Sequence, residues 1–137
     1  MRLLTTLVFS VLVLACSSAP AEPVTPVWGK QACDHCMMLV SERRSAAQLV
    51  LPSGSRKFFD DVGCLAAWLD QSGQAAQKAW VRAPVGEAWI DAFAARYGAG
   101  NRTPMDYGFL ASPQGISFQE LRSVLQERSA RRKEEYP

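Results

Sequence analysis

The six residues from Cys33 to Met38 read C-D-H-C-M-M and bring two thiols, one imidazole and two thioethers into one short segment. The segment holds the only histidine of the chain. Thiolate and thioether ligands select Cu(I) over ions that prefer oxygen. A C-x-x-C pair alone serves zinc, thiol redox chemistry and structural disulfides about equally well. The methionine two residues after the second cysteine favours copper, because zinc sites and disulfide exchange have no use for a thioether.

The N-terminus predicts export and a lipid anchor. Residues 1–15 are typical of a secretory signal peptide, because one arginine precedes an apolar run that is too short to span a bilayer. The run ends in L-V-L-A before Cys16, which resembles a bacterial lipobox, so we expect cleavage there and lipid on Cys16. An ordinary signal peptide with an incidental cysteine is the alternative. By the same resemblance, Ser17 rather than an aspartate after the cysteine implies sorting to the outer membrane. We therefore expect a periplasmic, membrane-anchored protein.

A folded domain is expected between a tether and a charged tail. Residues 16–27 are rich in Ser, Ala and Pro, and such a stretch is typical of an extended tether that buries no core. Residues 28–128 form the expected domain and residues 129–137 the tail. A net charge of +2, without a basic run interleaved with aromatics, gives no reason to expect a nucleic-acid partner.

The cysteine count constrains the domain further. After Cys16, the chain has three cysteines, Cys33, Cys36 and Cys64. An odd number of thiols in an oxidising compartment cannot be fully paired within one chain. At least one of them must stay free, ligate a metal or bridge to another molecule.

The order of hydrophobic patterns predicts an α+β fold built from hairpins rather than parallel crossovers. Strands are expected at residues 46–51, 56–59, 78–82, 89–93 and 107–111. Asp60 or Asp61 can cap a helix that ends at Ser72. The S-F-Q-E sequence from Ser117 is a capping box that opens a second helix, which should fade into the charged tail.

The remaining polar residues do not predict catalysis. Cys64 lies on the first helix one step from its apolar stripe, and we interpret it as a small buried hydrophobe rather than a ligand. Asp60 and Asp61 flank the helix start, where capping explains them. The sequence has no glycine-rich phosphate loop and no nucleophile elbow. We therefore expect a protein that is not an enzyme.

At Cys33 to Met38 the sequence resembles the NosL family, periplasmic copper lipoproteins associated with maturation of nitrous-oxide reductase. Its members carry C-x-x-C-G-M near the mature N-terminus, and Met37 stands here in place of the glycine. The resemblance continues in R-K-F-F-D at residues 56–60, W-I-D-A at 89–92 and P-M at 104–105. It implies a fold of two β-β-α-β-type units. The second unit should be trimmed, because the chain is short after residue 111, where relatives carry another helix.

The motif and the resemblance together suggest a ligand set. Cys33 and Cys36 are expected to bind Cu(I), with a structural disulfide as the alternative. Met38 is either a third ligand or a core residue. Met105, taken alone, is an ordinary turn residue, and only its match to the family's methionine turn implies a ligand. His35 either donates a nitrogen or lies in solvent.

We thus expect a lipid-anchored Cu(I) metallochaperone that delivers copper for maturation of a periplasmic copper enzyme. The resemblance implies nitrous-oxide reductase, or the membrane machinery that assembles its copper centres, as the recipient. A thiol-disulfide oxidoreductase using Cys33-x-x-Cys36 is the alternative, although the thioredoxin fold needs a strand before the first cysteine and a long helix after the second. A zinc module of Cys33, Cys36, Cys64 and His35 ranks last, because adjacent His35 and Cys36 make a four-ligand cage awkward.

Overall fold

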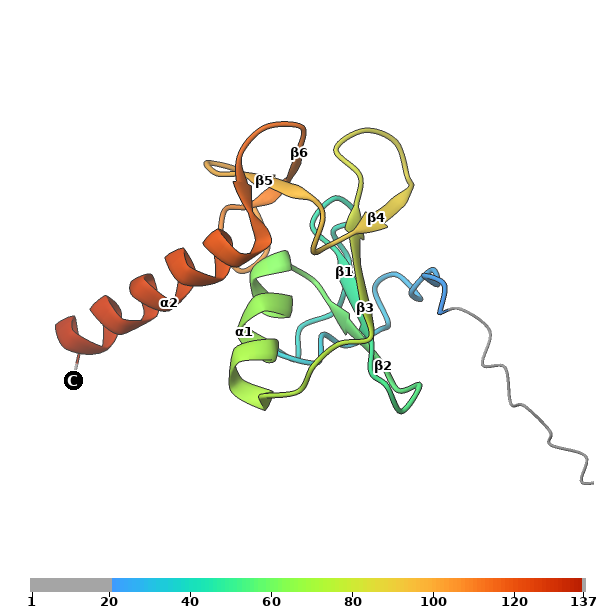
Figure 1. Cartoon of the computed structure of the whole chain (residues 1–137), viewed down its shortest axis with the longest axis horizontal. Helices are drawn as coiled ribbons and strands as arrows, with labels where there is room; N and C mark the ends of the chain where they lie inside the picture. Colours follow the sequence, from blue (N-terminus) through green and yellow to red (C-terminus); the bar gives the residue numbers. More distant parts are fainter. Residues whose placement is uncertain (1–20, 137) are drawn as a thin grey trace, which may run out of the picture.

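A computed structural model of the chain describes residues 21–136. The predicted signal peptide and the predicted lipidation site at Cys16 lie outside these residues. Figure 1 shows a mixed sheet-and-helix body from which the C-terminal helix projects. Neither helix of the described part combines the length and the apolarity needed to cross a membrane.

The first unit is the β-β-α-β arrangement that the sequence predicts. Strands β1 (Ala47–Val50) and β2 (Arg56–Phe59) form the expected hairpin, and helix α1 (Val62–Ser72) follows directly. Strand β3 (Lys78–Arg82) returns to the other side of β1, and β4 (Trp89–Asp91) extends the sheet. The strand order is β2-β1-β3-β4, and every pairing is antiparallel. Helix α1 covers one face of this sheet (Figure 1).

Helix α1 begins and ends where its local signals place it. The Asp61 carboxylate accepts a hydrogen bond from Gly63 N at 2.8 Å, which is the N-cap arrangement expected of an aspartate. Gly73 ends the helix in the left-handed conformation, with φ of 63°. The core is formed by the buried side of α1 and the inner face of the sheet, and includes Leu65, Leu69, Leu49, Phe59 and Val81.

The second unit is smaller, as the sequence predicts. Strands β5 (Arg96–Gly98), β6 (Leu110–Ser112) and β7 (Ile116–Ser117) form an antiparallel sheet in the order β6-β5-β7. A turn of three residues joins β6 to β7, so no helix stands between them. Helix α2 (Phe118–Glu135) follows, and its buried residues Phe118, Leu121 and Leu125 attach it to the core.

Two predicted strands have other bounds in the structure. The strand expected at 89–93 ends at Asp91, because the Asp91 carboxylate accepts hydrogen bonds from Phe93 N at 2.8 Å and Ala94 N at 3.2 Å and so starts a turn. The strand expected at 107–111 begins only at Leu110. Gly108 has a φ of 81°, which a regular strand does not accommodate.

The C-terminal helix is longer than expected. Its capping box is present, with Ser117 Oγ accepting from Glu120 N at 3.3 Å and Glu120 Oε2 accepting from Ser117 N at 2.7 Å. The helix then continues to Glu135, so the charged segment after residue 128 is helical and exposed rather than irregular. Arg, Ala, Lys and Glu are good helix formers, and a solvated charged segment built from them can remain helical.

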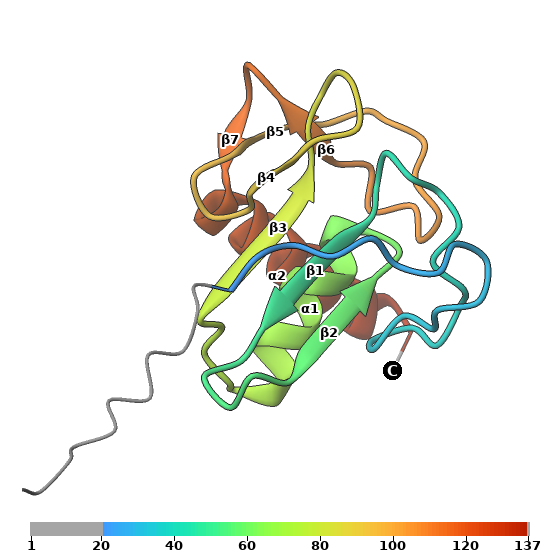
Figure 2. The ribbon, with the colours of Figure 1, turned by 90° about the vertical axis from the view of Figure 1, so that its right-hand side faces the viewer.

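Part of the expected tether is bound to the domain. Val24 N donates to Gln48 Oε1 at 2.9 Å, and Gln48 Nε2 donates to Val24 O at 2.8 Å. The Arg56 guanidinium donates to Glu22 O at 2.7 Å, and Pro26 is buried. Residues 22–27 therefore lie across the sheet face that α1 leaves open, as Figure 2 shows. The last part of the segment predicted to be an extended tether is therefore in contact with the domain.

Candidate metal centre

The C-x-x-C segment is a tight loop closed by backbone hydrogen bonds. An isolated β-bridge joins Ala32 and Leu39 at its base. Within the loop, Cys33 N donates to Met38 O at 2.7 Å, and Met37 N donates to Cys33 O at 3.0 Å. This geometry puts Met37 in the left-handed region, with φ of 66°. Glycine adopts that conformation without strain, which explains why the motif of the resembling family has glycine at this position.

Asp34 fixes the loop to the first sheet. Its backbone N–H donates to Phe58 O at 2.8 Å, and its carboxylate accepts from Phe58 N at 2.8 Å. The Lys57 ammonium forms an ion pair with the same carboxylate at 3.0 Å. Asp34 thus positions the C-x-x-C loop through the edge strand β2.

Helix α1 brings a third thiol to this loop. The sulfur atoms of Cys33, Cys36 and Cys64 all lie within 4.8 Å of one another. Cys33 and Cys64 are fully buried, whereas Cys36 is partly exposed. The interpretation of Cys64 as a buried residue is confirmed, but burial does not exclude it from the site. We call Cys33, Cys36 and Cys64 the thiol group.

Sequence reasoning gave Cys64 too small a role, although two signals pointed to it. The odd number of thiols left one cysteine without a partner. In addition, β2 leads directly into α1, so the first turn of the helix must lie beside the strand end that carries the C-x-x-C loop.

The thiol group divides into one acidic and two weakly acidic cysteines. Hydrogen bonding from the Cys64 thiol is the main cause that lowers the pKa of Cys33 to about 5, and Cys36 N also donates to Cys33 Sγ at 3.5 Å. The pKa of Cys64 is raised, chiefly because its proton is held by Cys33 and because it is buried. Burial also raises the pKa of Cys36. Near neutral pH, the metal-free group therefore contains a Cys33 thiolate beside two protonated thiols.

Two buried aspartates lie at the same end of α1, and both are engaged by backbone N–H groups. Asp60 Oδ1 accepts from Ser41 N at 3.0 Å, and Asp61 Oδ2 accepts from Met105 N at 3.3 Å. Burial is the largest cause that raises the pKa of each carboxyl group. Of the two aspartates that the sequence offers as helix caps, Asp61 is the cap, whereas Asp60 holds the turn before β1.

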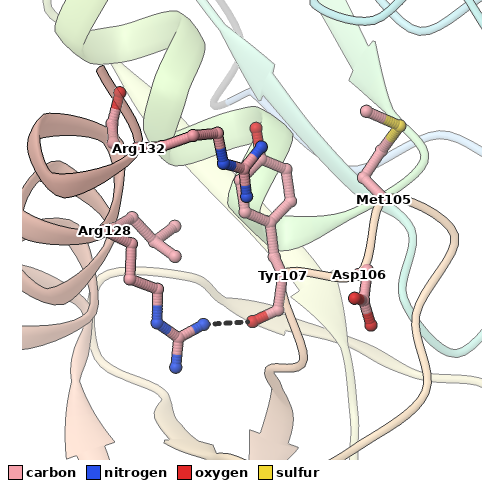
Figure 3. A pocket seen from close by; sticks show the side chains of 7 residues that line it. Met105, Asp106, Tyr107, Arg128 and Arg132 are labelled. Atoms are coloured by element: carbon pink, nitrogen blue, oxygen red, sulfur yellow. Dashed lines mark hydrogen bonds between the residues drawn. The ribbon is translucent and has the colours of Figure 1, made fainter. Parts of the chain in front are cut away.

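The loop of Met105 lies against the start of α1. Asp61 binds Met105 N, and the Tyr107 ring covers Gly63, where a Cβ atom would come within 2.1 Å of Tyr107 Cγ. Only Gly fits there, which places this loop one residue from Cys64. A pocket of about 380 Å³ lies between the loop and α2, and Arg128 donates there to Tyr107 O at 3.0 Å. Figure 3 shows the side chains that line this pocket. The Met105 thioether points away from Arg128 and Arg132 (Figure 3).

Met38 and His35, the two remaining predicted ligands, lie in the C-x-x-C loop. Met38 is 49% exposed and so does not fill the core, and its neighbour Met37 is 72% exposed. His35 is partly buried. Among residues 21–136, the potential metal-binding group around the cysteines contains three sulfurs and neither His35 nor a carboxylate. The structure thus brings Cys33 and Cys36 together with Cys64, and does not bring His35 into that group.

Comparisons with known proteins address the fold. No protein-family model matches the sequence, and no curated protein matches it significantly. The structure is similar to the crystal structure of the copper chaperone NosL from Shewanella denitrificans, with a TM-score of 0.57 and 16% sequence identity. The match covers 80% of this chain and 89% of that chain. At this identity the likeness establishes the architecture, and the chain therefore has the NosL-like α+β fold that its motifs suggest.

Proposed function

We propose that this protein is a metallochaperone that carries one Cu(I) ion on the thiolates of Cys33, Cys36 and Cys64. The observation that supports it best is the convergence of three cysteine sulfurs within 4.8 Å. Thiolates bond to such metals at about 2.3 Å, so three sulfurs around a planar centre lie about 4 Å apart. A movement of less than about 1 Å would close the group around the ion. The fold, shared with a copper chaperone, supports the same reading.

The protonation of the thiol group suits uptake of a soft cation. Cys33 already provides a thiolate, because its pKa is lowered to about 5. Binding of the ion would displace the protons of Cys36 and Cys64, since a metal-bound thiol is deprotonated. Cys36 is the only partly exposed member of the group and is the ligand that an incoming donor can displace first. Met38, in the C-x-x-C loop, and Met105, whose backbone N–H donates to Asp61, are the proposed additional thioether donors, which would suit stepwise transfer of the ion.

The rest of the proposal concerns where and to what the ion is delivered. We infer that the protein lies in the periplasm and is anchored to the membrane through lipid on Cys16. Ser17 after this cysteine favours the outer membrane. Nitrous-oxide reductase, or the machinery that assembles its copper centres, is the proposed recipient. The motif resemblance and the similarity to a NosL copper chaperone support this assignment.

The two competing functions fit the geometry less well. An oxidoreductase of the thioredoxin kind needs its C-x-x-C at the start of a helix, but Cys33 and Cys36 lie in a loop of turns before β1. A zinc module needs a fourth ligand, and within the described part of the chain His35 is not among the converging donors. Three soft ligands without a hard one favour Cu(I).

A metal competition experiment tests the proposal. Reduced, metal-free protein is titrated without oxygen with Cu(I) in the presence of a chromogenic Cu(I) chelator, and separately with Zn(II). We expect one Cu(I) per chain, bound far more tightly than Zn(II), with X-ray absorption showing sulfur neighbours only. Cys64→Ser should weaken Cu(I) binding by at least about tenfold, which corresponds to 1.4 kcal/mol. Preference for Zn(II), or copper binding that is unaffected by Cys64→Ser, would contradict the three-thiolate site.

A further inference from the structure

A second candidate site lies outside the thiol group, where the turn before β1 meets the loop between β3 and β4. It is a pocket of about 450 Å³ with a predominantly polar and charged lining. The lining consists of Ser41, Glu42, Arg43, Arg44, Arg82, Gly86 and Glu87. Three arginines against two glutamates leave an excess of one positive charge.

Arg82 is the central feature of this pocket, because it is a buried cation without a counter-ion. Its exposed fraction is only 6%. The guanidinium lies 5.9 Å from the ring centroid of Trp28 and 4.9 Å from that of Trp89. Within residues 21–136, it makes no ion pair and no side-chain hydrogen bond. Contacts with aromatic rings stabilise a guanidinium but leave its N–H donors unused.

The unused donors of Arg82 remain accessible to a ligand. In the described part of the chain, no fully buried side-chain nitrogen lacks a hydrogen-bond partner. The Arg82 nitrogens, which lack partners, must therefore retain some contact with solvent, and Arg82 is one of the residues that line this pocket. A buried charge of this kind is unfavourable unless an opposite charge pairs with it.

The two glutamates at the pocket do not neutralise Arg82. Glu87 pairs with Arg43 at 3.3 Å, and both side chains are largely exposed, at 76% and 56%. An exposed pair of this kind contributes little and can be replaced. Glu42 accepts a hydrogen bond from Arg44 N at 3.2 Å. Arg43 also lies 5.1 Å from the ring centroid of Trp28, so Trp28 contacts two arginines of the pocket.

We propose that this pocket binds a phosphate group, with Arg82 as its buried ligand and Arg43 as its exposed one. A phosphate oxyanion presents several acceptor oxygens and can be bridged by two guanidinium groups, which donate in a fixed fork. A single carboxylate is a poorer match, because the carboxylates of Glu42 and Glu87, which already line the pocket, do not pair with Arg82. The ligand is either a phospholipid headgroup or dissolved phosphate. The site is independent of copper.

Tryptophan fluorescence tests the site, because Trp28 and Trp89 adjoin Arg82. Protein with Cys16→Ser is titrated with inorganic phosphate, with sodium chloride at matched ionic strength as the reference. It is also titrated with phosphatidylcholine vesicles that contain or lack phosphatidylglycerol. We expect a saturable change in emission with at least one source of phosphate. Saturation with dissolved phosphate identifies an anion site, and binding to vesicles alone identifies a headgroup site.

Substitutions then separate ligand binding from a purely structural role. Arg82→Gln should weaken binding at least tenfold and Arg43→Gln severalfold, whereas Arg131→Gln, the matched loss of charge on exposed α2, should leave it unchanged. Glu87→Gln should strengthen binding, because it frees Arg43. If Arg82→Gln does not fold, the opposite effects of Arg43→Gln and Glu87→Gln decide the question. No saturable change with either source, or equal weakening by Arg131→Gln, would overturn the proposal.

Discussion

Cys64, in the first turn of α1, holds the sulfur of Cys33 in the thiolate form, so that the pKa of Cys33 is lowered to about 5. One residue comes from a helix and the other from a loop that is fixed to β2 through Asp34. The relative position of the two sulfurs therefore depends on the packing of α1 against the sheet. It is present in the metal-free fold and does not require copper to create it.

The first prediction concerns this pair in the metal-free protein. Cys64→Ala removes the donor and should raise the pKa of Cys33 from about 5 toward the ordinary value of 9.0. Cys64→Ser keeps a hydroxyl donor at the same position and should keep most of the lowering. The absorbance of the thiolate near 240 nm, followed against pH under reducing conditions, measures the shift. Identical titration curves for the two variants would show that hydrogen bonding is not the cause.

Met37 offers a test of backbone strain in the C-x-x-C loop. Its φ of 66° lies in the left-handed region, and its side chain is 72% exposed and packs little. Met37→Gly should therefore stabilise the metal-free protein by about 0.5–1 kcal/mol. This is the backbone strain that glycine relieves, minus the stability lost because glycine raises the conformational entropy of the unfolded chain. Met38→Gly is the control, because Met38 has no positive φ and should lose stability. Denaturant unfolding measures both, and destabilisation by Met37→Gly would contradict the strain.

The sequence predicts the elements that have strong local signals. The β1–β2 hairpin has a loop of turn formers, and α1 has Asp61 as its cap and Gly73 at its end. Strands β5 and β7 span only three and two residues, so no periodicity is readable in them. Pairing with distant segments forms them, together with contacts such as the hydrogen bond from Tyr97 Oη to Ala92 O at 2.6 Å.

The candidate site likewise combines residues that lie in one loop with a residue that tertiary packing brings to it. Cys33 and Cys36 are predicted together from the C-x-x-C spacing and the adjacent methionine, because all of these residues lie in one loop. Cys64 joins them through tertiary packing, and only the odd number of thiols and the short link from β2 to α1 indicate this in the sequence. Composition likewise made residues 22–27 look like an extended tether, since it cannot show that the buried amide of Gln48 forms two hydrogen bonds with the backbone of Val24.

Asp61 predicts a pH dependence of stability. Burial raises its pKa above the ordinary value of 3.8, so the folded state binds the proton more strongly than the unfolded state. This contribution to stability is fully present below pH 3.8 and is lost as the pH rises through the folded pKa. Asp61→Asn removes the titration but keeps an oxygen that caps Gly63. The free energy of unfolding of the variant relative to wild type should therefore increase between pH 4 and pH 7, measured by urea denaturation. A difference independent of pH would show that Asp61 titrates normally.

The last prediction concerns Met105, the thioether furthest along the chain from the thiol group. Its backbone is held by Asp61 at the start of α1, so its loop is fixed beside the turn that carries Cys64. Met105→Leu keeps the volume and the hydrophobicity and removes the sulfur. Stability should change by less than about 1.5 kcal/mol, as is usual for such exchanges.

If Met105 supplies a sulfur to the ion, copper affinity should fall measurably in Met105→Leu, and X-ray absorption should show one sulfur neighbour fewer. Met37→Leu is the matched control, because Met37 is exposed and stands where the resembling family has a glycine, which has no side chain. Its effect on affinity should be the smaller of the two. Unchanged affinity and an unchanged sulfur count in Met105→Leu would mean that Met105 does not bind the ion. The ligands would then be the three cysteines and Met38, and the loop of Met105 would only cover the start of α1.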